Sequence, residues 1–450
     1  MEATTLAGIF ATLASECDQS RMRALCGRSG DADWPHDAAW TEWLLMLSAE
    51  DVAAAERLGL HRVQHLVWSM PPTLRSLCGA VNAASSALGR DANGAPDCAG
   101  SCVWRQSPEK AEQVRSMLAA VGERCNLRSV RRVVDVGCGK GHLTAALRRA
   151  LGIPALGIDA DAELLSAARD LYPEVGFEAR DLVKAGLECA PGDLVVGLHP
   201  CGIMGEAVVS AVCGRAAGST EGATRPQMAG VSLLMVPCCW HKQGVPIREP
   251  LSSAGVDAGV RLPQAALKKA CMALDSAASV APRRARHELR ELLRLRGVDE
   301  VTLASRREMD GIQPRKARRG LAAIASDALH ARGMEPPSEM ELAEASRRAF
   351  DSFERDRKLS LLEPVFGELI ELLCTLDRAL ALQEAGLHAS VFRGFSAGAS
   401  SRNLCILAEG DQVAAPTDDD RASSRSQLCK TCDDVCIEDT EAAATVSNKI

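Results

Sequence analysis

The 450-residue sequence has no apolar run that approaches the roughly 18 residues of a membrane-spanning helix. Its first residues, Met1 to Cys17, include Glu2 and Glu16 and lack the basic stretch that opens a secretory signal peptide. There is no basic excess either, since the net charge of −7 argues against a wholly basic nucleic-acid-binding protein. We therefore expect no membrane partner and a reducing, cytoplasmic location, where most of the 18 cysteines pack as small buried side chains.

The chain is longer than one hydrophobic core usually supports, so two structural units are expected. Changes in pattern along the chain divide it into five segments. These are an N-terminal helical region (1–128), a Rossmann-like core (129–242), a helical insertion (243–385), the last sheet strands of the core (386–410) and a disordered acidic tail (411–450).

The centre of the chain alternates between strand and helix patterns. Helices are predicted at His142–Leu151, at Ala162–Tyr172 and from about Gly205 to Ala216. Short apolar or β-branched runs predict strands at Arg132–Val136, Ala155–Asp159, Gly176 to near Asp181, Asp193–Leu198, Val231–Val236, Ala389–Phe395 and Asn403–Ala408. Regular alternation and near-continuously apolar strands indicate a parallel sheet covered on both faces. We predict an α/β fold with a seven-stranded, Rossmann-like sheet.

Outside this alternation the apolar spacing is helical. Asp37–Leu58 and Glu109–Val121 have this spacing before the first strand. In the insertion, two serines stand three residues before a glutamate, as in a capping box, at Ser338 and Ser360. The second serine precedes a long amphipathic run from Leu362 to Leu380.

A glycine-rich loop, Gly137-Cys138-Gly139-Lys140-Gly141, follows the first predicted strand. Glycines there let the backbone approach a ligand closely, because they carry no Cβ. A dinucleotide-binding loop would have a glycine where His142 stands, so the spacing disfavours a nucleotide-dependent oxidoreductase.

Three aspartates fall at or near the ends of successive strands, where the ligands of parallel sheets bind. Asp135 beside the first glycine can take the ammonium group of a bound amino acid. Asp159 can accept both hydroxyls of a ribose, and Asp181 can face the amino group of an adenine. The alternative for Asp161 or Asp181 is that each caps a helix.

Together these features resemble the class I S-adenosylmethionine-dependent methyltransferases. Three further segments are similar to one family among them, which includes the glutathione S-transferase C-terminal-domain-containing protein and related methyltransferase-like proteins. They are Trp104 to Met117, Gly197-Leu198-His199-Pro200-Cys201-Gly202 and Val236-Pro237-Cys238-Cys239-Trp240-His241-Lys242. The resemblance implies that S-adenosyl-L-methionine is bound by Asp135, Gly137, Cys138, Gly139, Lys140, Gly141, Asp159, Asp181, Leu198 and His199.

Cysteines and histidines gather after the fourth and fifth strands, which adjoin in this fold. His199 or His241 could be the base that accepts a proton from an oxygen or nitrogen nucleophile. Zinc is a second hypothesis, since thiolates and imidazoles are its usual ligands. Adjacent cysteines such as Cys238 and Cys239 rarely bind one ion, however, so we expect no metal. The third reading is that the cysteines only pack.

Two other segments have weak signals. The basic stretch from Arg283 to Arg319 could contact phosphates, but interleaved acids and a lack of aromatics favour a solvated helix face. Cys429, Cys432 and Cys436 in the acidic tail are three ligands where a cluster needs four, so incidental cysteines are favoured.

The sequence therefore predicts a methyltransferase whose acceptor, RNA, protein or small molecule, cannot be read from it. The competing hypothesis is a catalytically silent methyltransferase fold that serves as a binding scaffold. The related family has a histidine soon after the position of Lys110 and an acid after that of Gly202, and both are missing here, which keeps this alternative open.

Overall fold

The computed structural model describes residues 5–17, 26, 35, 37–89, 107–214, 230–276, 280–299, 303, 309 and 312–410. Its contacts divide the chain into two compact units. The first comprises Met1–Cys17, Ala80–Cys271 and Leu369–Ile450, and the second comprises Asp18–Gly79 and Met272–Glu368. The five segments expected from the sequence follow changes in sequence pattern, whereas the two units follow contacts in the structure. The segment boundaries therefore stay predictions.

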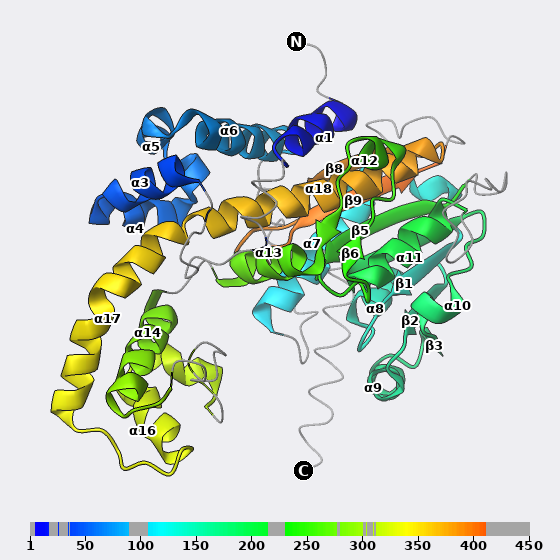
Figure 1. Ribbon diagram of the computed structural model, residues 1–450. Helices are drawn as coiled ribbons and strands as arrows, with labels where there is room; N and C mark the ends of the chain where they lie inside the picture. The colour runs from blue at the N-terminus through cyan, green and yellow to red at the C-terminus, as the bar shows by residue number, and fades with distance from the viewer. Residues whose placement is uncertain are drawn as a thin grey trace, which may run out of the picture. The chain divides into compact units, whose positions relative to one another are not determined.

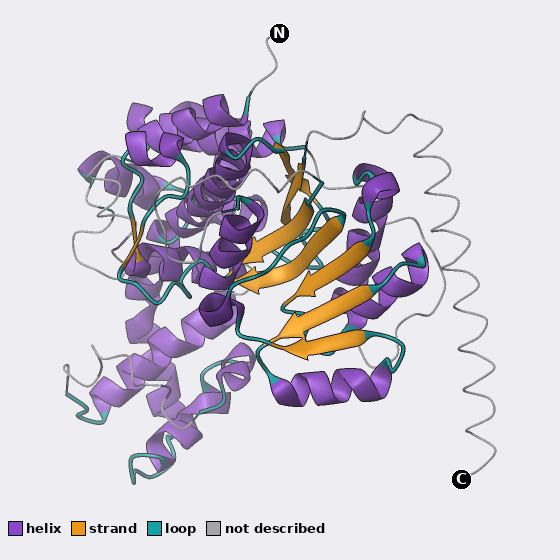
Figure 2. Ribbon diagram, turned by 90° about the vertical axis from the view of Figure 1, so that its right-hand side faces the viewer, coloured by secondary structure: helices purple, strands orange, loops and turns teal. Residues whose placement is uncertain are grey.

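The first unit is built on a seven-stranded mixed sheet of order β3-β2-β1-β4-β5-β9-β8 (Figure 2). The strands are β1 (Arg132–Val136), β2 (Ala155–Asp159), β3 (Gly176–Ala179), β4 (Asp193–Cys201), β5 (Ser232–Cys238), β8 (His388–Arg393) and β9 (Leu404–Glu409). Strands β1 to β5 pair in parallel, whereas β9 runs antiparallel to both of its neighbours. The predicted seven-stranded α/β sheet is confirmed, but the prediction of a parallel sheet is wrong for the pairings of β9 with β5 and β8.

Helices connect the parallel strands (Figure 1). They are α7 (Pro108–Arg124) before β1, then α8 (His142–Leu151), α9 (Ala162–Leu171), α10 (Leu182–Ala185) and α11 (Ile203–Val212). Local chemistry sets their ends: Asp161 caps α9 through the Glu163 and Leu164 N–H groups, and the left-handed Gly152 ends α8. Residues of α7, α8 and the strands form one apolar core, which explains the continuously apolar strands.

The strand order reverses between β1 and β4. From β1 the chain moves outward to β2 and β3, and it then returns to place β4 on the other side of β1. At such a switch point the loops after the two central strands diverge and leave a crevice at the carboxyl ends of the strands. The glycine loop after β1 and the turn after β4 are therefore neighbours.

Several predicted bounds move in the structure. Strand β4 runs to Cys201 rather than Leu198, and β5 runs to Cys238. Residues 37–58 form two helices, α3 (Ala38–Met46) and α4 (Ala49–Leu58), because Ser48 and Asp51 make a capping box between them. A short hairpin, β6 (Ile247–Arg248) with β7 (Leu262–Pro263), was missed because two-residue strands leave no periodicity.

One of the two predicted capping boxes is wrong. Ser338 caps α17 (Glu339–Leu359) as predicted, with Glu341 as its reciprocal partner. Ser360 is instead the C-terminal cap of α17, and its hydroxyl donates to the Arg357 carbonyl. The amphipathic run it precedes is nevertheless a helix, α18 (Leu362–Glu384).

The second unit is helical within the described residues. Its apolar core includes residues of α14 (Val280–Leu295), η4 (Pro314–Arg319), α16 (Ala322–His330) and α17. The predicted basic stretch includes residues of α14 and η4. Arg296, directly after α14, pairs with Glu341 at 2.6 Å, and Lys316 of η4 pairs with Asp327 at 2.5 Å. That the stretch is a solvated helix face stays a prediction.

The remaining helices are α1 (Leu6–Ser15), η1 (Leu60–Arg62), α5 (Gln64–Ser69), α6 (Pro72–Ala87), η2 (Leu127–Ser129), α12 (Ser253–Asp257) and α13 (Gln264–Ser276). Among the described residues, no helix combines the length and the apolar character needed to cross a membrane. The three tail cysteines at 429, 432 and 436 lie outside the described residues.

Candidate active site

The glycine loop between β1 and α8 has the form of a ligand cradle. Gly137, Gly139 and Gly141 all have positive φ, at 69°, 55° and 74°. A Cβ on Gly141 would lie 2.5 Å from the Phe177 ring, so this glycine is required by packing. A Cβ on Gly139 would meet no atom within 4 Å, so the backbone here borders open space that a ligand can enter.

Strand β2 fixes the position of this loop. The Gly137 N–H donates to the Ile158 carbonyl at 2.8 Å, and the Gly139 N–H donates to Asp159 Oδ2 at 2.9 Å. The other carboxylate oxygen of Asp159 accepts the Asp161 N–H at 3.0 Å. The predicted ribose acceptor therefore stands directly at the open glycine, held by two backbone donors.

Asp135 ends up buried beneath the loop. Its Oδ2 accepts the Thr144 hydroxyl at 2.6 Å. Burial raises the pKa of Asp135 to about 7, against the opposing effects of the Thr144 hydrogen bond and the positive charge of Lys110. The carboxyl group is thus poised to ionise when a cation binds beside it.

The other predicted cofactor residues of this region differ in exposure. Lys140 is exposed, and Cys138 is half-buried, with its Sγ against Gly157 of β2. Asp181 caps α10 through the Val183 N–H and pairs with Lys184 at 3.1 Å. The contacts of Asp181 are therefore those of a helix cap, which was the alternative hypothesis. Its predicted contact with the adenine amino group stays a prediction.

The turn after Leu198 brings His199 to the same edge of the sheet. Pairing of β4 with β5 is irregular between Leu198 and Cys201, and His199 has a positive φ of 69°. Its ring packs edge-on against Phe395 at 6.1 Å, and its buried Nδ1 has no hydrogen-bond partner among the described residues. Burial, with Lys110 and Arg402 nearby, lowers the pKa of His199 to about 4.

This lowered pKa predicts how stability depends on pH. Between His199's ordinary pKa of 6.5 and its folded value of about 4, the unfolded chain binds a proton that the folded chain does not. The contribution of His199 to the free energy of unfolding is therefore fully present above pH 6.5 and is lost as the pH falls toward 4. The loss between pH 7 and pH 5 is about 2 kcal/mol. Urea unfolding at both pH values should show this loss shrinking in His199→Gln, and an equal loss in the variant would contradict the assignment.

Three thiols converge beside His199. Cys201 Sγ lies 3.4 Å from Cys238 Sγ, and the sulfurs of Cys201, Cys238 and Cys239 all lie within 4.8 Å of one another. Neither His199 nor His241 belongs to this group. The hydrogen bond from Cys238 lowers the pKa of Cys201, and the same contact raises that of Cys238. His241 follows β5, and its carbonyl accepts a hydrogen bond from Gln264 at 3.3 Å.

Lys110 is a site residue that the sequence analysis did not single out. It lies on α7, half-buried, and burial lowers its pKa, while Asp135 and Cys238 oppose this effect. Its charge acts on Asp135, His142 and His199, so it lies between the glycine loop and the thiols. The signal was its helical spacing with the buried Val114 and Met117, which places a lysine on the core side of α7.

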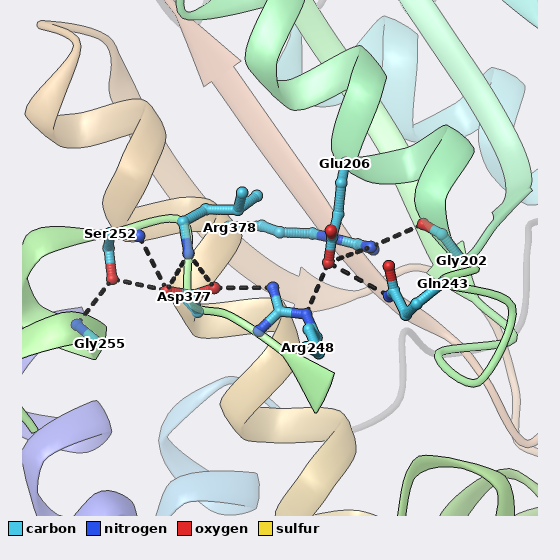
Figure 3. A network of polar contacts seen from close by, with 9 residues as sticks. Gly202, Glu206, Gln243, Arg248, Ser252, Gly255, Asp377 and Arg378 are labelled. Atoms are coloured by element: carbon cyan, nitrogen blue, oxygen red, sulfur yellow. Dashed lines mark hydrogen bonds and ion pairs between the residues drawn. The ribbon is translucent and has the colours of Figure 1, made fainter. Parts of the chain in front are cut away.

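A buried ionic network anchors the loops that carry the thiols (Figure 3). Arg248 pairs with Glu206 of α11 at 2.6 Å and with Asp377 of α18 at 2.7 Å. Arg378, which is fully buried, donates to the Gly202 carbonyl at 3.0 Å and lies over the Trp240 ring at 4.6 Å. The turns after β4 and β5 are thus fixed to α18, which holds the thiols and His199 in place.

Part of the chain is similar to known methyltransferases. Residues 109–243 match a family described as a methyltransferase domain. The trans-aconitate 2-methyltransferases of Azoarcus sp. (strain BH72) and Rhizobium etli are 38% identical over 88 residues and 36% identical over 75 residues. These matches cover 19% and 16% of this chain, and 33% and 28% of the relatives. The chain thus matches about a third of their length.

Two solved structures illustrate the similarity of part of the chain to proteins of known structure. A TehB-like SAM-dependent methyltransferase from Corynebacterium glutamicum is 21% identical, with 27% of this chain and 60% of that chain covered and a TM-score of 0.20. Coclaurine N-methyltransferase, bound to N-methylheliamine and SAH, is 12% identical, with 43% and 59% covered and a TM-score of 0.24.

The narrower resemblance to the glutathione S-transferase C-terminal-domain-containing protein stays a prediction. The broader assignment has support from the family match, from the strand order and from the open glycine loop after β1. The chain therefore contains a methyltransferase domain, matched over residues 109–243, with the class I fold.

Proposed function

We propose that the protein transfers a methyl group from S-adenosyl-L-methionine to an acceptor that contains an oxygen, nitrogen or sulfur nucleophile. The observation that carries this proposal is the open backbone at Gly139, flanked by the carboxylates of Asp135 and Asp159 at the switch point of the sheet. Bound there, the cofactor would supply an electrophilic methyl group on a sulfonium.

Each carboxylate has a distinct proposed role in binding. Asp135 receives the ammonium group of the methionine part, which a buried carboxylate can pair with strongly. Asp159 accepts the ribose hydroxyls, and Asp181 faces the adenine amino group. The loop from Gly137 to Gly141, with Cys138, Gly139 and Lys140, forms the floor of the groove, and Leu198 lines its side.

The residues around the methyl group mainly orient and desolvate the reactants. In-line displacement at a sulfonium gains most of its rate from alignment, so a strong base is not required. His199, with its lowered pKa, is neutral at pH 7 and can accept a hydrogen bond from the acceptor. His241 is the second candidate, placed by the turn after β5.

The acceptor is proposed to be an RNA or a protein. The partial similarity to trans-aconitate methyltransferases makes a small carboxylic acid a further candidate. Mass spectrometry of RNA, protein and small-molecule methylation in cells with and without this chain would identify the acceptor. A catalytically silent scaffold would leave all three pools unchanged although the protein binds the cofactor.

The cytoplasmic location expected from the sequence stays a prediction.

Cofactor choice provides the direct test of the proposal. By isothermal titration calorimetry, the purified chain should bind S-adenosylmethionine and S-adenosylhomocysteine and should not bind NAD. The reason is the glycine spacing, with His142 where a dinucleotide loop has its last glycine. Tight NAD binding without binding of either sulfur compound would refute the methyltransferase assignment.

Asp159→Ala should weaken S-adenosylhomocysteine binding about tenfold to a hundredfold. The two ribose hydroxyls would lose a charged acceptor, and we expect these contacts together to contribute about 1.5–3 kcal/mol. Asp257→Ala, which removes an exposed carboxylate of α12, is the control and should bind as the unaltered chain does. An unchanged dissociation constant in folded Asp159→Ala would mean that the ribose lies elsewhere.

A further inference from the structure

We propose that Cys201, Cys238 and Cys239 form a binding site for one thiophilic divalent metal ion, with Zn²⁺ as the best fit. The first observation is the spacing of their sulfurs. Two of them are 3.4 Å apart, and all three lie within 4.8 Å of one another. Tetrahedral zinc with Zn–S bonds of about 2.3 Å holds its sulfurs about 3.8 Å apart, which lies between these values.

The second observation is the backbone that produces this spacing. In an extended strand, adjacent side chains point to opposite faces, so Cys238 and Cys239 should not share a ligand. Cys239 instead has a φ of 49°, and its sulfur lies with the other two. The objection from sequence spacing therefore does not hold in the folded chain.

This conformation is rare in the molecule. Among the described residues, His199 and Cys239 are the two non-glycine residues with positive φ. His199 lies at the irregularity near the end of β4, and Cys239, one of the three thiols, directly follows β5. Strained backbone of this kind persists where surrounding structure holds it and is concentrated at functional sites. The buried network of Arg248, Glu206 and Arg378 supplies that support.

The third observation is a positive charge beside the thiols. A divalent ion would bind the sulfurs as thiolates. Lys242 Nζ, 3.9 Å from Cys201 Sγ, would offset the remaining negative charge.

Three protein ligands leave one tetrahedral position open. Structural zinc sites usually have four protein ligands, whereas three ligands and an open position are typical of sites that bind water or a substrate. Cys201 and Cys239 are half-buried rather than enclosed, so the open position has access from outside. The metal proposal does not rest on the proposed methyl transfer, because Cys201, Cys238 and Cys239 are not among the residues proposed to bind the cofactor.

The experiment is metal analysis of the full chain, purified and reconstituted with Zn²⁺ under reducing conditions. We expect one zinc per chain by inductively coupled plasma mass spectrometry. Replacement by Co²⁺ should give thiolate-to-cobalt charge-transfer absorption and the visible bands of tetrahedral cobalt. Octahedral cobalt spectra, or no stoichiometric metal, would overturn the proposal.

Single variants locate the ligands. Cys201→Ser and Cys239→Ser should each bind zinc at least tenfold more weakly. Replacement of Cys189, a half-buried cysteine in the segment before β4, by serine should leave zinc binding normal. Circular dichroism and S-adenosylhomocysteine binding would show that the variants are folded. If mass spectrometry of the unaltered chain instead finds a disulfide between Cys201 and Cys238 that excludes metal under these conditions, the thiols are a redox pair and the proposal is wrong.

Discussion

Affinity for S-adenosylhomocysteine is expected to fall on the order of 50-fold between pH 7 and pH 5, with a slope that approaches tenfold per pH unit at the acid end of this range. The cause is the buried Asp135 carboxyl, whose pKa is raised to about 7. Only its ionised form can pair with the ligand's ammonium group, and the ionised fraction falls tenfold per unit below the pKa. Calorimetry across this pH range measures the effect.

The sign of this dependence follows from the direction of the pKa shift. A raised carboxyl pKa means that the folded, ligand-free chain favours the neutral acid. The stability from this group is present below pH 3.8 and is lost as the pH rises through about 7. Ligand binding draws the proton off, so the measured affinity must rise with pH.

Two variants separate this effect from general acid damage. Asp135→Asn should bind S-adenosylhomocysteine about 2–5 kcal/mol more weakly at pH 8, which is roughly 30-fold to several thousand-fold, with a flat pH dependence. Asp257→Asn removes an exposed carboxylate of α12 that is not among the proposed cofactor residues, and it should keep the dependence of the unaltered chain. A flat profile in the unaltered chain would show that Asp135 is already ionised or does not contact the ammonium group.

The sequence was sufficient to predict the sheet, because each central strand is a continuous apolar run that could only be covered on both faces. Asp135 and Asp159 were found from the same pattern, since strand ends place them at the switch point. Asp181 shows the limit of that reasoning, because a strand-end acid that opens a helix also caps it. Position alone could not choose between the two uses.

Features that depend on one residue's backbone or on distant pairing were out of reach. The positive φ of Cys239 accompanies the placement of its sulfur beside that of the adjacent Cys238, and sequence spacing does not predict this backbone conformation. Lys110 needed the packing of α7 to bring it to the site. Arg248 and Asp377 are separated by 129 residues, and neither has a local pattern that marks it as buried.

That last pair predicts the largest loss of stability. Asp377 accepts from Arg248 Nη2 at 2.7 Å, from the Leu251 N–H at 2.9 Å, and from the Ser252 N–H and hydroxyl at 3.0 and 2.7 Å. Its side chain and that of Arg248 are each only 1% exposed. Asp377→Ala would leave a buried guanidinium with one acid partner, Glu206, and would strip two backbone donors of their acceptor.

We expect Asp377→Ala to lower the free energy of unfolding by about 3–5 kcal/mol, which is typical when one member of a buried ion pair is removed. Urea unfolding followed by circular dichroism measures this change. Asp257→Ala, which removes an exposed carboxylate at the end of α12, is the control and should change stability by less than about 0.5 kcal/mol.

Asp377→Asn tests which part of the interaction matters. The amide keeps the shape and one acceptor oxygen, so it can still serve one of the Leu251 and Ser252 donors, but it loses the charge that Arg248 faces. If charge dominates, Asp377→Asn should lose most of the stability that Asp377→Ala loses. If the backbone donors dominate, it should lose much less. A loss below about 1 kcal/mol in Asp377→Ala itself would mean that water enters and solvates Arg248, so the network would not hold the turns after β4 and β5 as rigidly as their contacts indicate.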